Sequence, residues 1–225
     1  RYQDGPVGNC RYSDATVFSF HPVKVMTTGE GGMVVTNDEG IASKVARLRS
    51  HGITRRPEEM TRPPDGPWYY QQIELGYNYR MTDIQAALGS SQLTRLDAAV
   101  ARRNRLAERY DSLLACLPLE LPPRARHQVS AMHLYVVRLA SPSVIGAHRA
   151  IFEDMREAGI SVNLHYIPIH LQPYYQQHGF SGAAFPEAEH YYARAISLPM
   201  YPTLREEEQD LVVQSLKRAI DRHSE

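Results

Sequence analysis

Residues 15–36 constrain the fold of this chain more than any other stretch. The apolar run Ala15–Phe20 has the length and composition of a buried strand, and Lys24 follows four residues after it. A glycine-rich turn over residues 29–32 then leads into a second short strand over residues 33–36. A lysine delivered to a loop by a strand, in partly apolar surroundings, can have a lowered amine pKa and act as a nucleophile. Schiff-base formation is the chemistry that most needs such an amine.

The same stretch carries a family resemblance. Ser-Phe-His-Pro-x-Lys-x-x-Thr-Thr-Gly-Glu-Gly-Gly, read from Ser19 to Gly32, closely resembles the signature of the DegT/DnrJ/EryC1/StrS family of pyridoxal-phosphate-dependent sugar aminotransferases. The resemblance implies that Lys24 is the catalytic residue, bonded covalently to the cofactor, and that Ser19 hydrogen-bonds the cofactor phosphate. Taken alone, Lys24 would be interpreted as an ordinary surface lysine. The length of the match favours the catalytic interpretation.

A second resemblance to this family lies at Gly76-x-Asn78-x-Arg80. In proteins with this segment the asparagine reaches across a dimer interface to the neighbouring subunit's cofactor phosphate, so Asn78 is a candidate for a cofactor contact made in trans. Arg80 is a candidate for substrate binding beside it. The alternative from the residues alone is a loop that only positions a helix capped by Thr82 or Asp83.

The third stretch with this resemblance runs from His165 to Tyr175 and matches the family's nucleotide-sugar C4 aminotransferases. It implies that His165, Tyr166 and His170 face the substrate, because their uncharged donors and aromatic faces suit a sugar ring. Structural histidines that close backbone hydrogen bonds are the main alternative. A metal site is not expected, because Pro168 prevents a shared helix face and no cysteine or carboxylate lies nearby in the sequence.

Composition limits the possible partners. Twenty-five lysines and arginines balance 25 aspartates and glutamates, so no net field attracts nucleic acid. No apolar run approaches the roughly 20 residues of a membrane span, and cytoplasm is the expected compartment. Cys10 and Cys116 lie in dissimilar contexts and are expected to be free thiols.

The expected fold class is α/β. The resemblance implies a fold-type-I aminotransferase, with the C-terminal part of the large cofactor-binding domain over residues 1–117 and a small α/β domain over residues 118–225, separated by a proline-rich boundary. Strands are expected over residues 15–20, 33–36, 133–139 and 161–164, and helices after residue 38, over 82–117 with a kink or break at Gly89-Ser90-Ser91, and over 147–158, 187–195 and 203–220. Asn37 or Asp38 is expected to cap the first helix and Gly52 to end it. Gly159 is expected to end the 147–158 helix, whose inward face is Ile151, Phe152 and Met155, and Thr203 and Glu206 have the spacing of a capping box. Residues 54–68 are expected to form a surface loop, and residues 196–202 an extended connection.

Family members are considerably longer, so this chain is expected to be the C-terminal part of such an enzyme. Their first half supplies an aspartate for the pyridine nitrogen, and no equivalent precedes Ser19. The isolated chain is therefore expected to be inactive, whereas its parent is expected to be a homodimer with shared active sites. The implied reaction transfers an amino group from an amino acid, such as glutamate, to a nucleotide-linked keto sugar, with C4 of a UDP-linked 6-deoxy-N-acetylhexosamine of the pseudaminic type as the narrower assignment.

Two alternatives remain open. The chain could be a non-catalytic fragment that only dimerises or binds substrate. It could also belong with the sugar dehydratases of the same family, which have a histidine in place of the lysine. The lysine at position 24 argues against the dehydratases.

Overall fold

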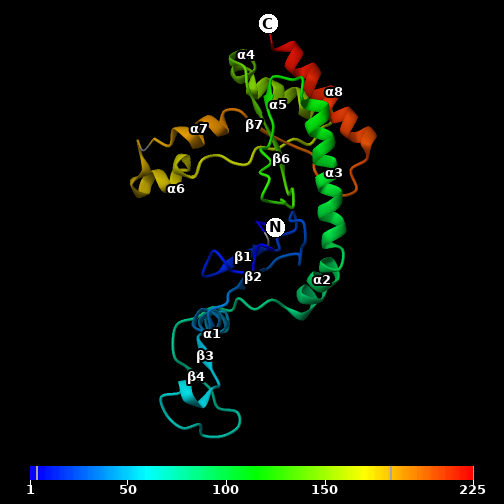
Figure 1. The fold of residues 1–225 in the computed structure, drawn as a ribbon. Coiled ribbons are helices and arrows are strands. Elements are labelled where there is room, and N and C mark those ends of the chain that lie inside the picture. Colours follow the sequence, from blue (N-terminus) through cyan, green and yellow to red (C-terminus); the bar gives the residue numbers. More distant parts are fainter. Residues whose placement is uncertain (4, 183, 225) are drawn as a thin grey trace. The chain divides into compact units, whose positions relative to one another are not determined.

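The computed structural model describes residues 1–3, 5–182 and 184–224 (Figure 1). The chain forms two compact units. The first comprises Arg1–Asp97 with His127–Val129, and the second comprises Ala98–Arg126 with Ser130–Glu225. The division falls inside helix α3 (Leu96–Leu114). The domain boundary predicted between residues 117 and 118 lies within the second unit and stays a prediction.

In its described residues, the first unit contains two short antiparallel strand pairs and two helices, and the second strand pair encloses a 3₁₀ turn. Its elements are β1 (Thr16–Ser19), β2 (Gly32–Val35), α1 (Glu39–Leu48), β3 (Ile53–Thr54), the 3₁₀ turn Pro57–Glu59, β4 (Gln71–Gln72) and α2 (Asp83–Leu93). Strand β1 pairs with β2, and Ser19 lies opposite Gly32. The two strands predicted around the lysine segment are therefore confirmed.

Side-chain caps begin both helices of this unit. The Asp38 carboxylate accepts the Ile41 N–H at 2.8 Å and starts α1. Thr82 starts α2 through a capping box, in which the Gln85 side chain accepts the Thr82 N–H at 2.9 Å. Helix starts were predicted at both places, and the structure confirms them.

The predicted break at Gly89-Ser90-Ser91 is wrong. Helix α2 runs continuously through Gly89, and the chain breaks at Thr94 and Arg95 before α3 begins. A 3.1 Å bond from Arg95 N–H to the Gln92 carbonyl tightens the last turn of α2. Gly89 lies inside the helix at a point where a Cβ would come within 2.8 Å of the Thr28 methyl.

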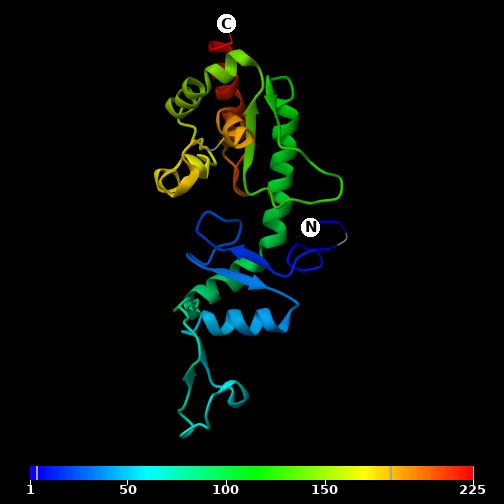
Figure 2. The same ribbon diagram turned by 90° about the vertical axis from the view of Figure 1, so that its left-hand side faces the viewer.

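The second unit is built on a three-stranded antiparallel sheet of order β5-β6-β7, with helices beside it (Figure 2). Its elements are β5 (Leu119–Glu120), β6 (Tyr135–Leu139), α4 (Pro142–Gly146), α5 (His148–Glu157), the 3₁₀ turn Ile169–Leu171, α6 (Pro173–Tyr175), the π-helical turn Gln176–Phe180, α7 (Pro186–Tyr192), β7 (Ala195–Leu198) and α8 (Glu206–Arg222). The α/β fold class is confirmed.

The main hydrophobic core lies in this second unit. The rings of Tyr110 on α3 and Tyr135 on β6 pack with centroids 4.9 Å apart, and both residues are fully buried. Helix α5 lies against α8, and Ile151 and Met155 point into the core at the spacing the sequence predicted. Gly159 follows the C-cap with φ +79°, as predicted for the end of this helix.

Three expectations for the second unit need correction. Residues 196–202 were predicted to form an extended connection, but β7 is a fully buried strand that pairs with β6. Residues 161–164 contain only an isolated bridge from Asn163 to Ser197, not a strand. Helix α8 starts after Arg205, whose N–H donates to Glu208 at 2.8 Å, so Thr203 and Glu206 do not form the cap.

Among the helices that the structure describes, none combines the length and the apolar composition needed to cross a membrane.

Candidate cofactor and substrate sites

The loop that carries Lys24 is closed at Phe20, directly after β1. The Phe20 N–H donates to the Gly31 carbonyl at 2.9 Å. The Phe20 carbonyl accepts from the Thr28 N–H and from the Thr27 hydroxyl, each at 3.0 Å. Phe20 itself is buried. These bonds bring the two ends of the loop together, so the Lys24 segment is held as a defined turn.

Thr28 connects this loop to helix α2. The residue is buried, and its hydroxyl donates to the Glu30 carbonyl at 2.7 Å. A Cβ on Gly89 would lie 2.8 Å from the Thr28 methyl, and a Cβ on Gly31 would lie 2.8 Å from the Met81 methyl. Glycine at both positions therefore permits the close approach of the loop and the helix.

Lys24 and Ser19 lie on the same hairpin and carry uncommitted polar groups. The Lys24 N–H closes a turn on the His21 carbonyl at 2.9 Å, while the side chain is partly exposed. Ser19 is exposed at the end of β1. Within the described part of the chain, neither the Lys24 amine nor the Ser19 hydroxyl has a hydrogen bond or ion pair. Both groups are available to a ligand.

Asn78 and Arg80 lie in a segment pinned to the end of α1. A Cβ on Gly52 would lie 1.9 Å from the Glu74 carbonyl oxygen, and one on Gly76 would lie 2.1 Å from the Gly52 nitrogen. Only glycines permit two backbones to cross so closely. Gly52, predicted to end α1 directly, instead lies at this crossing, beyond the C-cap Arg49.

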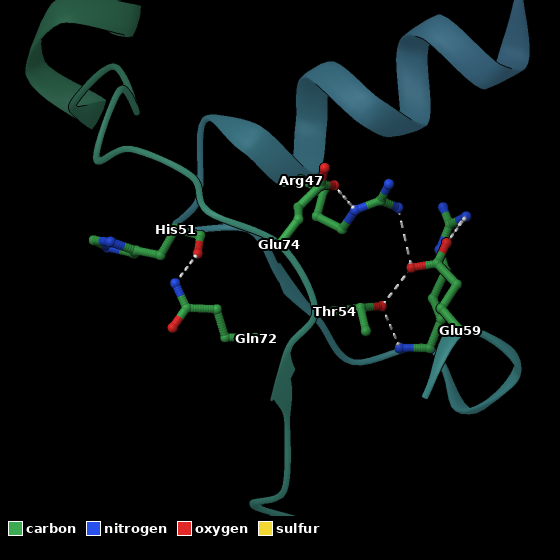
Figure 3. A network of polar contacts seen from close by, with 7 residues as sticks. Arg47, His51, Thr54, Glu59, Gln72 and Glu74 are labelled. Carbon is green, nitrogen blue, oxygen red and sulfur yellow. Dashed lines mark hydrogen bonds and ion pairs between the residues drawn. The ribbon is translucent and has the colours of Figure 1, made fainter. Parts of the chain in front are cut away.

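Polar side chains reinforce the crossing (Figure 3). Arg47 on α1 bonds Glu74 on one side and Glu59, at 3.5 Å, on the other. The Thr54 hydroxyl donates to Glu59 at 2.6 Å, and this bond, together with Arg47, holds the pKa of Glu59 below its ordinary value. The network fixes the base of the 54–72 hairpin and the start of the Asn78 segment.

Tyr77 and Tyr79 stack on one face of this segment, with centroids 4.8 Å apart and planes at 10°. Because alternate residues of an extended chain share a face, Asn78 lies on the opposite one. Asn78 and Arg80 are exposed. Among the described residues, their side chains form no hydrogen bond or ion pair, either with the Ser19 and Lys24 hairpin or elsewhere.

The other three predicted substrate residues, His165, Tyr166 and His170, lie in the second unit. His165 Nδ1 is 2.8 Å from the hydroxyl of Ser197, and its ring packs edge-on against Tyr166 at 4.5 Å. Tyr166 is 71% exposed. Its position suits a contact with a ligand.

His170 is only 6% exposed. Its Nε2 lies 2.9 Å from a Glu189 carboxylate oxygen, and its ring packs against Phe185 at 4.6 Å. Hydrogen bonds from His170 and from the Phe185 N–H hold the pKa of Glu189 below its ordinary value. This is the contact that a structural histidine makes, and the substrate role of His170 stays a prediction.

Sequence reasoning missed three residues of these sites: Thr28, Ser197 and Glu189. Thr28 lies within the Ser19–Gly32 signature, but its contact with Gly89 cannot be read from that motif, and no local motif marks Ser197 or Glu189. A serine between apolar neighbours in Ala195–Leu198 was the one available signal. No group of three potential metal-ligating side chains occurs among the residues that the structure describes.

Comparisons with known proteins agree with this geometry. A model of the DegT/DnrJ/EryC1/StrS aminotransferase family matches residues 1–217. The chain is 38% identical over 210 residues to the Bacillus subtilis spore coat polysaccharide biosynthesis protein SpsC, a match covering 91% of this chain and 53% of SpsC. The chain spans about half the length of the curated relatives it matches.

Two solved structures share the fold closely. Helicobacter pylori PseC, an aminotransferase involved in the biosynthesis of pseudoaminic acid, superposes with a TM-score of 0.88 at 31% identity, over 99% of this chain and 57% of PseC. The putative sugar aminotransferase Spr1654 from Streptococcus pneumoniae, in its PMP form, gives a TM-score of 0.88 at 30% identity over 99% of this chain and 55% of Spr1654. The chain thus has the α/β fold of the sugar aminotransferases and belongs to the DegT/DnrJ/EryC1/StrS aminotransferase family.

Proposed function

We propose that the protein carrying this chain is a pyridoxal-phosphate-dependent aminotransferase that moves an amino group from an amino acid to a nucleotide-linked keto sugar. The observation that carries this proposal is the Lys24 loop, which holds a partly exposed amine with no partner in the described chain. A primary amine held in this way is the group that covalent catalysis at a carbonyl requires.

The donor set on the first unit suits the cofactor. Lys24 offers the amine, and Ser19, at the end of β1, offers a hydroxyl for a phosphate oxygen. The amide of Asn78 could donate to the same phosphate from a neighbouring subunit. The PLP-form structure of Spr1654, similar to this chain at a TM-score of 0.86 and 31% identity, supports this cofactor.

Pyridoxal phosphate, when bound, supplies an electron sink for the carbon that loses its proton. The chain's part is to place a base beside that carbon. After release from covalent attachment, the Lys24 amine would take the proton as general base and return it as general acid. The hydrogen bonds that close the loop at Phe20 keep Lys24 in reach during this transfer.

For the sugar, the proposed contacts are His165, Tyr166, His170 and Arg80. The exposed Tyr166 ring offers a face for sugar C–H groups, and Arg80 offers a charge for the nucleotide diphosphate. The narrower proposed reaction is amination at C4 of a UDP-linked 6-deoxy-N-acetylhexosamine of the pseudaminic type, and the likeness to PseC, an aminotransferase involved in the biosynthesis of pseudoaminic acid, is compatible with it. Glutamate is the proposed donor, and cytoplasm the proposed compartment.

Borohydride reduction followed by peptide mass spectrometry tests the role of Lys24. The chain has only three lysines, Lys24, Lys44 and Lys217, and the other two are exposed on helices α1 and α8. Reduction with pyridoxal phosphate present should fix the cofactor on Lys24 alone. Lys24→Ala should lose the adduct in this chain and the activity in the longer protein that carries it, whereas Lys44→Ala should keep both.

An adduct spread evenly over the three lysines would refute the proposed role of Lys24. Full transamination by Lys24→Ala would refute it as well.

A further inference from the structure

Ser197 is a buried hydroxyl in an otherwise apolar strand. It is 4% exposed, and the other residues of β7, Ala195, Ile196 and Leu198, are also buried. An apolar side chain would pack there without needing a hydrogen-bond partner. Packing of the core therefore does not explain why a hydroxyl group stands at this position.

Among the residues that the structure describes, Ser197 makes its hydrogen bonds outside the sheet with one segment, residues 163–165. Its N–H donates to the Asn163 carbonyl at 2.7 Å, its carbonyl accepts the Asn163 N–H at 3.2 Å, and its hydroxyl lies 2.8 Å from His165 Nδ1. The two backbone hydrogen bonds between Ser197 and Asn163 fix the position of the 163–165 segment along the edge of β7. The hydroxyl then fixes the plane of the imidazole ring.

The oriented imidazole of His165 in turn packs against the exposed ring of Tyr166. His165 and Tyr166 meet edge to face, with planes at 87°. The far end of the segment is held separately, because His170 is bonded to Glu189 and buried. Between these two anchors Tyr166, Ile167 and Ile169 remain exposed.

We propose that Ser197 is a positioning residue for sugar recognition: through His165 it fixes the ring of Tyr166, against which the sugar of the nucleotide sugar packs. The inference rests on the proposed function. Ser197 touches no substrate itself. It holds the rings of His165 and Tyr166 in one arrangement before the sugar binds, so less conformational entropy is lost on binding.

Substitutions in the cofactor-loaded protein test the inference. The probe is UDP-N-acetylglucosamine, a stable analogue of the proposed keto sugar, and its Kd is measured by calorimetry. Ser197→Ala should raise Kd about fivefold, the equivalent of one ordinary hydrogen bond of about 1 kcal/mol. KM for the keto sugar should rise similarly, whereas KM for the amino donor should stay unchanged.

Two comparisons separate positioning from general loss of stability. Ser197→Thr and Ser197→Val have nearly the same shape, so a tighter Kd in the threonine variant reports the hydroxyl alone, even if Ser197→Ala folds poorly. Ser215→Ala, at an equally buried serine on α8, should leave Kd unchanged. In a His165→Ala background, Ser197→Ala should have no further effect, because Ser197 acts through that ring.

Equal Kd values for Ser197→Thr and Ser197→Val would overturn the inference. So would a full Ser197→Ala effect that persists in the His165→Ala background, or wild-type protein that loads cofactor on Lys24 but does not bind the probe. Failure of Lys24 to take up cofactor would instead overturn the proposed function. Cofactor uptake is measured by reduction and mass spectrometry, whereas sugar binding is measured by calorimetry.

Discussion

Three buried polar side chains hold the candidate site segments in place: Thr28, His170 and Ser197. Each is less than 7% exposed, and each contacts a separate segment of the chain. Breaking the hydrogen bond of His170 or of Ser197 would leave a buried polar group without a partner, which costs free energy, whereas Thr28 contacts helix α2 through its methyl group. Of these pairs, the contact between His170 and Glu189 has a pH dependence that can be measured.

The pKa of Glu189 is lowered by its hydrogen bond from His170, so its contact should weaken in acid. A group whose pKa is lower in the folded state stabilises the fold above its unfolded pKa, about 4.3 for glutamate, and loses this contribution as pH falls through the folded value. Glu189→Gln should therefore lower Tm near neutral pH, and the gap to wild type should close below about pH 4.

Glu187→Gln on the same helix is the matched control, because Glu187 has no hydrogen bond or ion pair among the residues described. It should leave Tm nearly unchanged across this range. A gap between wild type and Glu189→Gln that is constant from pH 3 to pH 8 would show that the carboxylate charge does not matter.

At the scale of single elements, helix α2 adjoins both the Asn78 segment and the Lys24 loop. It begins directly after the Asn78 to Arg80 segment, and Gly89 in its middle gives room to the Thr28 methyl of the Lys24 loop. Glycine is a poor helix residue, and its presence here is explained by this packing rather than by a break in the helix.

Gly89→Ala should destabilise the protein although alanine is the better helix former. The new Cβ would lie 2.8 Å from the buried Thr28 side chain, and crowding of this kind costs about 1–3 kcal/mol, against a propensity gain of about 1 kcal/mol. Displacing Thr28 should also weaken cofactor binding. Thermal unfolding and a pyridoxal phosphate titration measure the two effects.

Gly146→Ala is the matched control. Gly146 ends helix α4, and its substituted Cβ would meet no atom within 4 Å, so this variant should be stabilised by roughly 0.5–1 kcal/mol. Equal stabilisation of both variants would show that Thr28 moves aside freely and that α2 does not brace the loop.

At the scale of the whole molecule, large apolar side chains around the Asn78 segment of the first unit are exposed. Ile84 on α2 is 84% exposed and Leu75 is 80% exposed, and both Tyr77 and Tyr79 are exposed as well. Apolar groups gathered in this way mark interaction surfaces. They support the proposal of a homodimer in which Asn78 serves the neighbouring subunit's cofactor.

Subunit mixing tests this shared site. Lys24→Ala and Asn78→Ala proteins should each be inactive or severely impaired. If Asn78 acts in trans, the heterodimer has one site with both native residues, so mixing should restore up to about a quarter of wild-type activity when exchange is random. Mixing either variant with itself is the control.

No recovery despite confirmed subunit exchange would place Asn78 in the site of its own subunit. Purification as a monomer with full activity would contradict the dimer itself.

Local signals determined much of this protein from sequence alone. The two strands on either side of Lys24, the caps Asp38 and Thr82 and the end of α5 at Gly159 were predicted because each depends on residues a few positions apart. The roles of Lys24, Ser19 and Asn78 came from resemblance, and they stay predictions.

Only the tertiary structure decided which polar side chains meet. His165 and Ser197 are 32 residues apart, and His170 and Glu189 are 19 apart, so no pattern in either segment could pair them. The same holds for β7, which is a strand because β6 pairs with it, and for Gly89, where a methyl group from the Lys24 loop leaves no room for a side chain. Periodicity and capping act over one or two turns, whereas burial and hydrogen-bond pairing are settled only when distant segments come together.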